Sequence, residues 1–167
     1  MDVTQFYAGV KKDHMGRTLQ EIQRFPFDDL EDCHDYIQWM FPLPEPSNYN
    51  PFCPLIEEQD IFEFKNNPFL KQRLLESLDV MLEFYGFVRS HGIATGVNFR
   101  QRCKNWVTPY NHNFLRLTRI IRSLHVLGCQ NEAKDLQKVL EYVYNIPGNA
   151  KIIGEETLSY WRAATCS

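Results

Sequence analysis

The segment from residue 67 to residue 86 places the strongest constraint on the fold of this chain. It opens with Asn67 and Pro68, an order typical of a helix with a capping asparagine and a proline in its first turn. The apolar residues that follow are spaced three or four positions apart up to Gly86: Leu70, Leu74, Leu75, Leu78, Met81, Leu82 and Tyr85. This spacing gives a helix one continuous apolar face, whereas a half-buried strand would alternate apolar and polar residues. We therefore predict a long helix over 68–85.

The same spacing predicts helices in most of the remaining chain. Asp28 or Asp29 can cap a helix that ends near Phe41, where Pro42 stops it. Further helices are expected at about 99–107, at 131–145, at 155–164, and from Thr108-Pro109 to a cap at Gly128. Gly92 and Gly96 bracket a loop, and no lasting alternation indicates a strand.

Five prolines crowd the segment from Pro42 to Pro54, which excludes a helix and predicts an extended, semi-rigid loop over 43–54. With 167 residues the chain fits one domain covering 1–167. The expected fold class is all-α, a compact single-domain bundle of about six or seven helices with a proline-rich extended loop.

Cysteine usage and hydropathy indicate an intracellular protein. The five cysteines are odd in number, widely spaced and free of CxxC pairs, which is typical of reduced thiols in the cytoplasm or the nucleus. The N-terminal segment has no apolar core of a signal peptide, and no apolar run approaches the ~20 residues of a spanning helix. We expect cytoplasmic or nuclear localisation and no transmembrane segment.

Two motifs resemble a known family. Residues 34–42 read HDYIQWMFP, similar to the HDYIQWLFP signature of the opioid growth factor receptor family, with Met40 in place of leucine. Residues 112–124 read HNFLRLTRIIRSL, similar to the HNxLRITRILKSL segment of that family, with Leu117 for isoleucine, Ile121 for leucine and Arg122 for lysine. The resemblance implies a receptor that binds the pentapeptide methionine enkephalin and restrains cell growth, unrelated to the seven-helix opioid receptors.

The first motif and the residues just before it carry a candidate ligand-binding face made of Asp32, Asp35, Tyr36 and Trp39. Carboxylates and aromatic rings suit the N-terminal ammonium and an aromatic side chain of a peptide. The alternative is that a neighbouring helix covers Trp39, because tryptophan is usually well buried. His34 is expected near the inward face, where a lone histidine is more often a hydrogen-bonded core residue than a ligand.

The charges of the chain are segregated, because no Asp or Glu occurs from Phe84 to Asn131 while seven Lys and Arg do. His112, Arg116 and Arg119 are expected on one side of a helix, where they could bind a phosphate or a peptide carboxylate. Alternatively, Arg116 or Arg119 packs against Asp32 or Asp35. An anion or nucleic-acid module would use Arg100, Arg102, Lys104, Arg116, Arg119 and Arg122, although the net charge of −3 makes nucleic acid an unlikely partner.

No motif for catalysis, cofactor or metal binding is present. The chain has no nucleophile elbow, phosphate-binding loop or dinucleotide fingerprint, and His125 and Cys129 have no further pair to complete a metal site. A small enzyme with His112 as base remains the third alternative. The residues therefore predict a non-enzymatic binding domain without cofactor or metal, and the family resemblance implies a peptide as its ligand.

Overall fold

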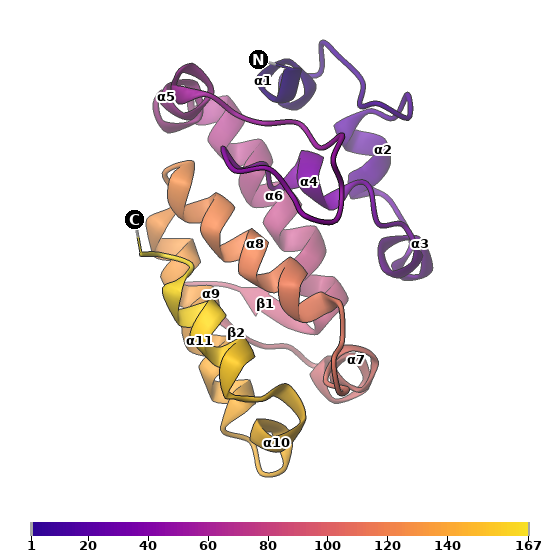
Figure 1. Cartoon of the computed structure of the whole chain (residues 1–167), viewed down its shortest axis with the longest axis vertical. Coiled ribbons are helices and arrows are strands. Elements are labelled where there is room, and N and C mark those ends of the chain that lie inside the picture. The colour runs from indigo at the N-terminus through magenta and orange to yellow at the C-terminus, as the bar shows by residue number, and fades with distance from the viewer. Residues whose placement is uncertain (1, 167) are drawn as a thin grey trace. The chain divides into compact units, whose positions relative to one another are not determined.

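The computed structural model describes residues 2–166, which form eleven helices and one two-stranded sheet (Figure 1). Six helices have eight or more residues: α5 (Glu58–Asn66), α6 (Pro68–Tyr85), α7 (Phe99–Trp106), α8 (Asn113–Val126), α9 (Gln130–Tyr144) and α11 (Glu155–Ala163). The other five are short: α1 (Asp2–Tyr7), α2 (Leu19–Gln23), α3 (Phe27–Asp32), α4 (Ile37–Met40) and α10 (Asn149–Ile153). The mostly helical class is confirmed, and the described residues form more helices than the six or seven that were predicted.

The chain divides into two compact units. Unit 1 contains residues 1–80 and 126–128, and unit 2 contains residues 81–125 and 129–167. The helix α6 runs from unit 1 into unit 2, and it begins as predicted, because the Asn67 side chain accepts a hydrogen bond from the Phe69 N–H at 3.0 Å. That the whole chain is one domain stays a prediction.

The core of unit 1 is built around two aromatic residues of α1, Phe6 and Tyr7, which are fully buried. The Tyr7 hydroxyl donates to the Met40 carbonyl of α4 and lies 2.9 Å from the Ser77 hydroxyl of α6. The Tyr7 ring also packs edge-on against Phe64 of α5, with 5.2 Å between centroids. One side chain therefore joins four helices of this unit.

The proline-rich segment of unit 1 contains no helix, as predicted. Its two ends lie together, because Leu43 and Leu55 form an isolated parallel bridge and the Ile56 N–H donates to the Leu43 carbonyl at 3.2 Å. The loop therefore folds back on itself next to α4.

The core of unit 2 holds two buried tryptophans. The indole N–H of Trp106 donates to the Tyr85 carbonyl at 3.0 Å, and that of Trp161 donates to the Phe114 carbonyl at 3.1 Å. The Tyr85 hydroxyl donates to the buried Asn113 side chain at 3.0 Å. Each polar atom in these pairs is satisfied within the core, as burial requires.

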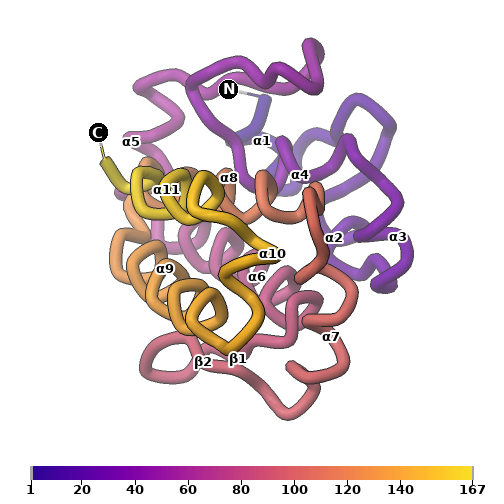
Figure 2. Tube along the Cα trace, turned by 60° about the horizontal axis from the view of Figure 1, so that its bottom comes forward, coloured from indigo at the N-terminus to yellow at the C-terminus, as the bar shows by residue number. Residues whose placement is uncertain are grey.

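A short hairpin in unit 2 contradicts the expectation that strands are absent. The strands β1 (Phe87–Arg89) and β2 (Ile93–Thr95) pair antiparallel, with Phe87 opposite Thr95. His91 and Gly92 turn the chain with positive φ values of 55° and 135°. Figure 2 shows the hairpin beside α9, which packs on β2. Strands of three residues are too short to leave an alternating pattern in the sequence.

The start of α8 also differs from the prediction. The helix begins at Asn113 rather than at Pro109, because Tyr110 adopts a left-handed φ of 57° that no helix accommodates. The Asn111 side chain then accepts the Asn113 N–H at 2.9 Å and caps the helix. Within residues 2–166, no helix combines the length and apolar character needed to cross a bilayer.

Candidate functional site

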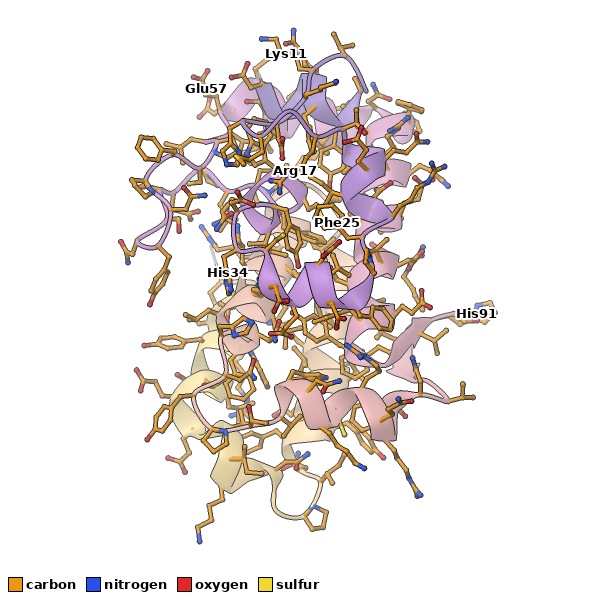
Figure 3. The ribbon with its side chains drawn as sticks, turned by 90° about the vertical axis from the view of Figure 1, so that its right-hand side faces the viewer. Lys11, Arg17, Phe25, His34, Glu57 and His91 are labelled. Atoms are coloured by element: carbon orange, nitrogen blue, oxygen red, sulfur yellow. The ribbon has the colours of Figure 1, made fainter. Side chains whose placement is uncertain are left out.

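The acidic segment of unit 1 is not the single helix that the sequence predicts. The helix α3 ends at Asp32, Cys33 takes an extended conformation (φ −81°, ψ 131°), and α4 begins only at Ile37. Pro26 occupies the N-cap of α3, so neither Asp28 nor Asp29 is the cap. His34 lies in the break and is exposed, which makes its expected inward position wrong (Figure 3).

The two aromatic residues of the predicted face are buried. Tyr36 is inaccessible, and its hydroxyl donates to the Leu30 carbonyl at 2.5 Å. Trp39 is 7% exposed and packs edge-on against Phe6, with 5.2 Å between centroids. Its indole N–H donates to Nδ1 of His14 at 3.0 Å. The alternative of a covered tryptophan therefore describes Trp39, and a ligand role for either ring stays a prediction.

The two carboxylates of the predicted face remain accessible. Asp32 is exposed at the end of α3, and the Asp35 side chain is 37% exposed. One oxygen of Asp35 accepts from the Arg17 guanidinium at 3.0 Å, and the other lies 3.5 Å from Nε2 of His14. Asp35 is thus held in place by two residues from the loop before α2.

Arg17 links two carboxylates within unit 1. Its Nε donates to the fully buried Asp13 carboxylate at 2.7 Å, its Nη1 donates to Asp35, and its guanidinium lies over the Phe25 ring at 5.9 Å (Figure 3). Burial lowers the pKa of Arg17, but hydrogen bonds to Asp13 and Asp35 outweigh it and raise that pKa above its ordinary value. The guanidinium therefore stays charged and fixes Asp35.

Sequence reasoning missed His14 and Arg17, although one local signal was present. Asp13 accepts the backbone N–H groups of Met15 and Arg17 at 3.0 and 2.8 Å, and Gly16 has a left-handed φ of 74°. An aspartate three residues before a glycine is typical of such a turn. The signal predicts the turn, but the partner of Arg17 lies 18 residues further along the chain.

In unit 2 the predicted basic residues differ in exposure. His112 is exposed and precedes α8, Arg119 is partly buried, and Arg116 is only 6% exposed within α8. Arg116 is therefore buried and does not belong to an open surface. Whether Arg116 or Arg119 meets an acidic residue of unit 1 stays a prediction.

Other basic residues of unit 2 do lie at the surface. Arg100 and Lys104 are exposed one turn apart on α7, and Arg89 is exposed at the end of β1. Arg102 instead contacts Phe84: its Nε donates to the Phe84 carbonyl at 2.7 Å, and its guanidinium lies over the Phe84 ring. Of the predicted basic surface, Arg100 and Lys104 are the residues best placed for an anion.

In the part of the chain that the structure describes, no group of three or more His, Cys, Asp or Glu side chains is placed to hold a metal ion. What the described groups can do is bind charge: the Asp32 and Asp35 carboxylates suit a cation, and the α7 surface suits an anion. The fold and these groups define a mostly helical protein with an accessible acidic pair in unit 1 and a basic surface in unit 2.

Comparison with known proteins identifies the family. The family described as "Opioid growth factor receptor (OGFr) conserved region" matches residues 6–165, so the chain belongs to this family. It is 38% identical to the human opioid growth factor receptor over 111 residues, which are 63% of this chain and 16% of that protein. It is 31% identical to the rat opioid growth factor receptor-like protein 1 over 138 residues, 81% of this chain and 29% of that protein.

The rat opioid growth factor receptor is 37% identical over 109 residues, which cover 63% of this chain and 18% of the receptor. The chain thus spans less than a third of the length of these relatives. No solved structure gives a significant match.

Proposed function

We propose that this chain is a non-enzymatic binding domain for a short peptide of the methionine enkephalin type, and that Asp32 and Asp35 bind its N-terminal ammonium. The observation that carries the proposal is the accessible carboxylate of Asp35, which Arg17 fixes in position three residues after the exposed Asp32. Family membership supports a peptide, because the relatives are named for an opioid growth factor.

The electrostatics of unit 1 support a cationic ligand group. No Lys or Arg occurs from Phe25 to Phe64, and unit 1 has 15 Asp and Glu against 7 Lys and Arg, a net charge of −8. A surface with this excess attracts an ammonium before contact and strengthens the hydrogen bonds after it.

Titration calorimetry with the pentapeptide at low salt tests the proposal. Asp32→Asn and Asp35→Asn should each weaken binding by roughly tenfold, since a hydrogen bond to a charged group contributes about 1.5 kcal/mol. Glu58→Gln, at an exposed acid on α5 of the same unit, is the matched control. The same peptide with an acetylated N-terminus has no ammonium, and equal binding of that peptide would exclude the proposed contact.

The proposal extends to the cellular role that the family resemblance implies, which is restraint of cell growth from within the cytoplasm or the nucleus. A tagged chain expressed in cultured cells should lie in one of these compartments and slow proliferation. The Asp32→Asn chain should lie in the same compartment as the unchanged chain, but it should no longer slow proliferation. Growth restraint that persists in this variant would separate the cellular role from peptide binding.

A second candidate function is anion binding by unit 2. The observation that favours it is the exposed pair Arg100 and Lys104, in a stretch without acidic residues. Inorganic tripolyphosphate is a suitable probe, and its affinity should fall with salt. The double change Arg100→Gln and Lys104→Gln should weaken binding, whereas the same changes at the exposed Lys134 and Lys138 of α9 should not.

A further inference from the structure

The hydrogen bond between Trp39 and His14 fixes the protonation state of the histidine. An indole N–H can only donate, so Nδ1 of His14, at 3.0 Å, must accept with its lone pair. The two rings are nearly parallel, with 6° between their planes and 6.1 Å between centroids. The imidazole is therefore neutral in this arrangement and carries its proton on Nε2.

That Nε2 proton faces the ligand-binding carboxylate of the proposed function. Nε2 lies 3.5 Å from one oxygen of Asp35, and the His14 side chain is one third exposed. The other charged groups of this cluster are Arg17, bound to the second oxygen of Asp35, and Asp13, bound to Arg17. A proton can reach His14 from solvent, and Asp35 stabilises the resulting cation.

Protonation of His14 is incompatible with its bond to Trp39. A second N–H on the ring would place two donors 3.0 Å apart, so the indole and the imidazole must separate. The cationic ring is attracted to Asp35, and it would then occupy the carboxylate that a ligand ammonium needs.

We propose that His14 is a proton-controlled positioning residue for Asp35: when neutral it holds Trp39, and when protonated it releases Trp39 and pairs with Asp35. The effect on the ligand rests on the proposed function, whereas the exchange of partners does not.

The three indole N–H signals in a ¹H–¹⁵N NMR spectrum test the exchange. From about pH 7.5 to about pH 5.5, a range that brackets imidazole protonation, the Trp39 signal should shift along one titration curve with the His14 ring. Trp106 and Trp161 donate to backbone carbonyls and should not shift, so they are internal controls. A Trp39 signal that stays fixed while His14 titrates, or a His14 that does not titrate, would overturn the proposal.

Two variants separate this role from simple packing. In His14→Gln an amide oxygen can still accept from Trp39, so the Trp39 signal should lose its pH dependence while the fold is kept. In His14→Ala the signal should resemble a free indole N–H at every pH. If the Trp39 signal of His14→Gln titrates as in the unchanged chain, His14 is not the controlling group.

Peptide titration at the two pH values completes the test. The pentapeptide should bind more weakly at the lower pH to the unchanged chain, but equally at both to His14→Gln. If Trp39 titrates and no peptide binds at either pH, the exchange stands and the proposed function fails. If the peptide binds with the same affinity whether or not His14 is present, the proposed function stands, but His14 does not control peptide binding.

Discussion

The two units carry opposite charge and satisfy their buried tryptophans in different ways. Unit 1 has a net charge of −8, and unit 2, with 6 Asp and Glu against 11 Lys and Arg, has a net charge of +5. In unit 1 the indole of Trp39 depends on the titratable ring of His14, whereas Trp106 and Trp161 of unit 2 donate to backbone carbonyls. The comparison predicts that pH acts on the Trp39 hydrogen bond of unit 1 and leaves the Trp106 and Trp161 hydrogen bonds of unit 2 unchanged.

A buried ion pair of unit 1 can be compared with an exposed pair of unit 2, although unit 1 also has an exposed pair, Lys11 with Asp2. In unit 1 the Arg17 side chain is 16% exposed and its partner Asp13 is inaccessible, whereas the pair of Arg162 with Glu141 in unit 2 is 60% and 41% exposed. Desolvated pairs are costly to break because the remaining charge has no water, while exposed pairs contribute little. Variants of both pairs therefore test whether burial decides how much an ion pair contributes to stability.

The largest effect is expected for Arg17→Met. The change removes the cation shared by Asp13 and Asp35 and leaves the Asp13 carboxylate buried with backbone partners alone. We expect a loss of about 3 kcal/mol in the free energy of unfolding, measured by urea denaturation. Arg24→Met, at an exposed arginine next to α2, is the control. Equal stability of the two variants would show that Arg17 does not hold the loop to Asp35.

The next effect concerns pH and Asp60 of α5. Burial raises the pKa of Asp60, but hydrogen bonds from the Glu57 N–H and the Thr4 hydroxyl outweigh it and hold that pKa below its ordinary value. A carboxyl with a depressed folded-state pKa adds stability above the unfolded-state pKa, and this stability is lost as pH falls through the folded-state pKa.

Asp60→Asn should therefore lower the free energy of unfolding by about 1 kcal/mol at neutral pH. The reason is that the Asp60 carboxylate accepts the Glu57 N–H in the capping box of α5, and an amide accepts this hydrogen bond more weakly. The difference from the unchanged chain should shrink in acid, where Asp60 itself is protonated. Melting curves between neutral pH and acid measure it, with Glu58→Gln as the control. A difference that is the same at every pH would contradict the depressed pKa.

The long helices could be predicted from the sequence because their signals are local. Asn67 and Pro68 mark the start of α6, and the apolar spacing that follows needs no knowledge of partners. The break between α3 and α4 has no such signal, since Cys33 to Tyr36 contain neither glycine nor proline. It is fixed instead by contacts, such as the Tyr36 hydroxyl on the Leu30 carbonyl and Asp35 on Arg17.

The accessibility of Asp32 and Asp35 could be predicted from the sequence, because charged side chains favour the surface. Whether they bind a ligand stays a prediction. The burial of Trp39 depends on Phe6 and His14, which lie 33 and 25 residues earlier in the chain. Pairings over such distances follow from the fold, and neither composition nor periodicity encodes them.

A moderate effect is expected for Asp35→Ala. The change removes one of the two carboxylate partners of Arg17 and the group facing His14. Because more than a third of the Asp35 side chain is exposed, solvent screens the pair, and we expect a loss of about 1 kcal/mol. Glu156→Ala changes an exposed acid of unit 2 whose carboxylate accepts from Tyr160, and it should cost about 0.5 kcal/mol or less. Equal melting temperatures of Asp35→Ala and Glu156→Ala would exclude a structural role for Asp35.

The smallest effect is expected for Arg162→Met. Its pair with Glu141 joins α11 to α9 at the surface, where water solvates both charges and the side chains lose entropy to stay paired. We expect a change of about 0.5 kcal/mol or less in the free energy of unfolding, fading further at high salt. Lys151→Met, at an exposed lysine of α10, controls for the loss of one positive charge. Were Arg162→Met as costly as Arg17→Met, burial would not be what makes the Arg17 pair contribute more than the Arg162 pair, and the contrast between the two pairs would be wrong.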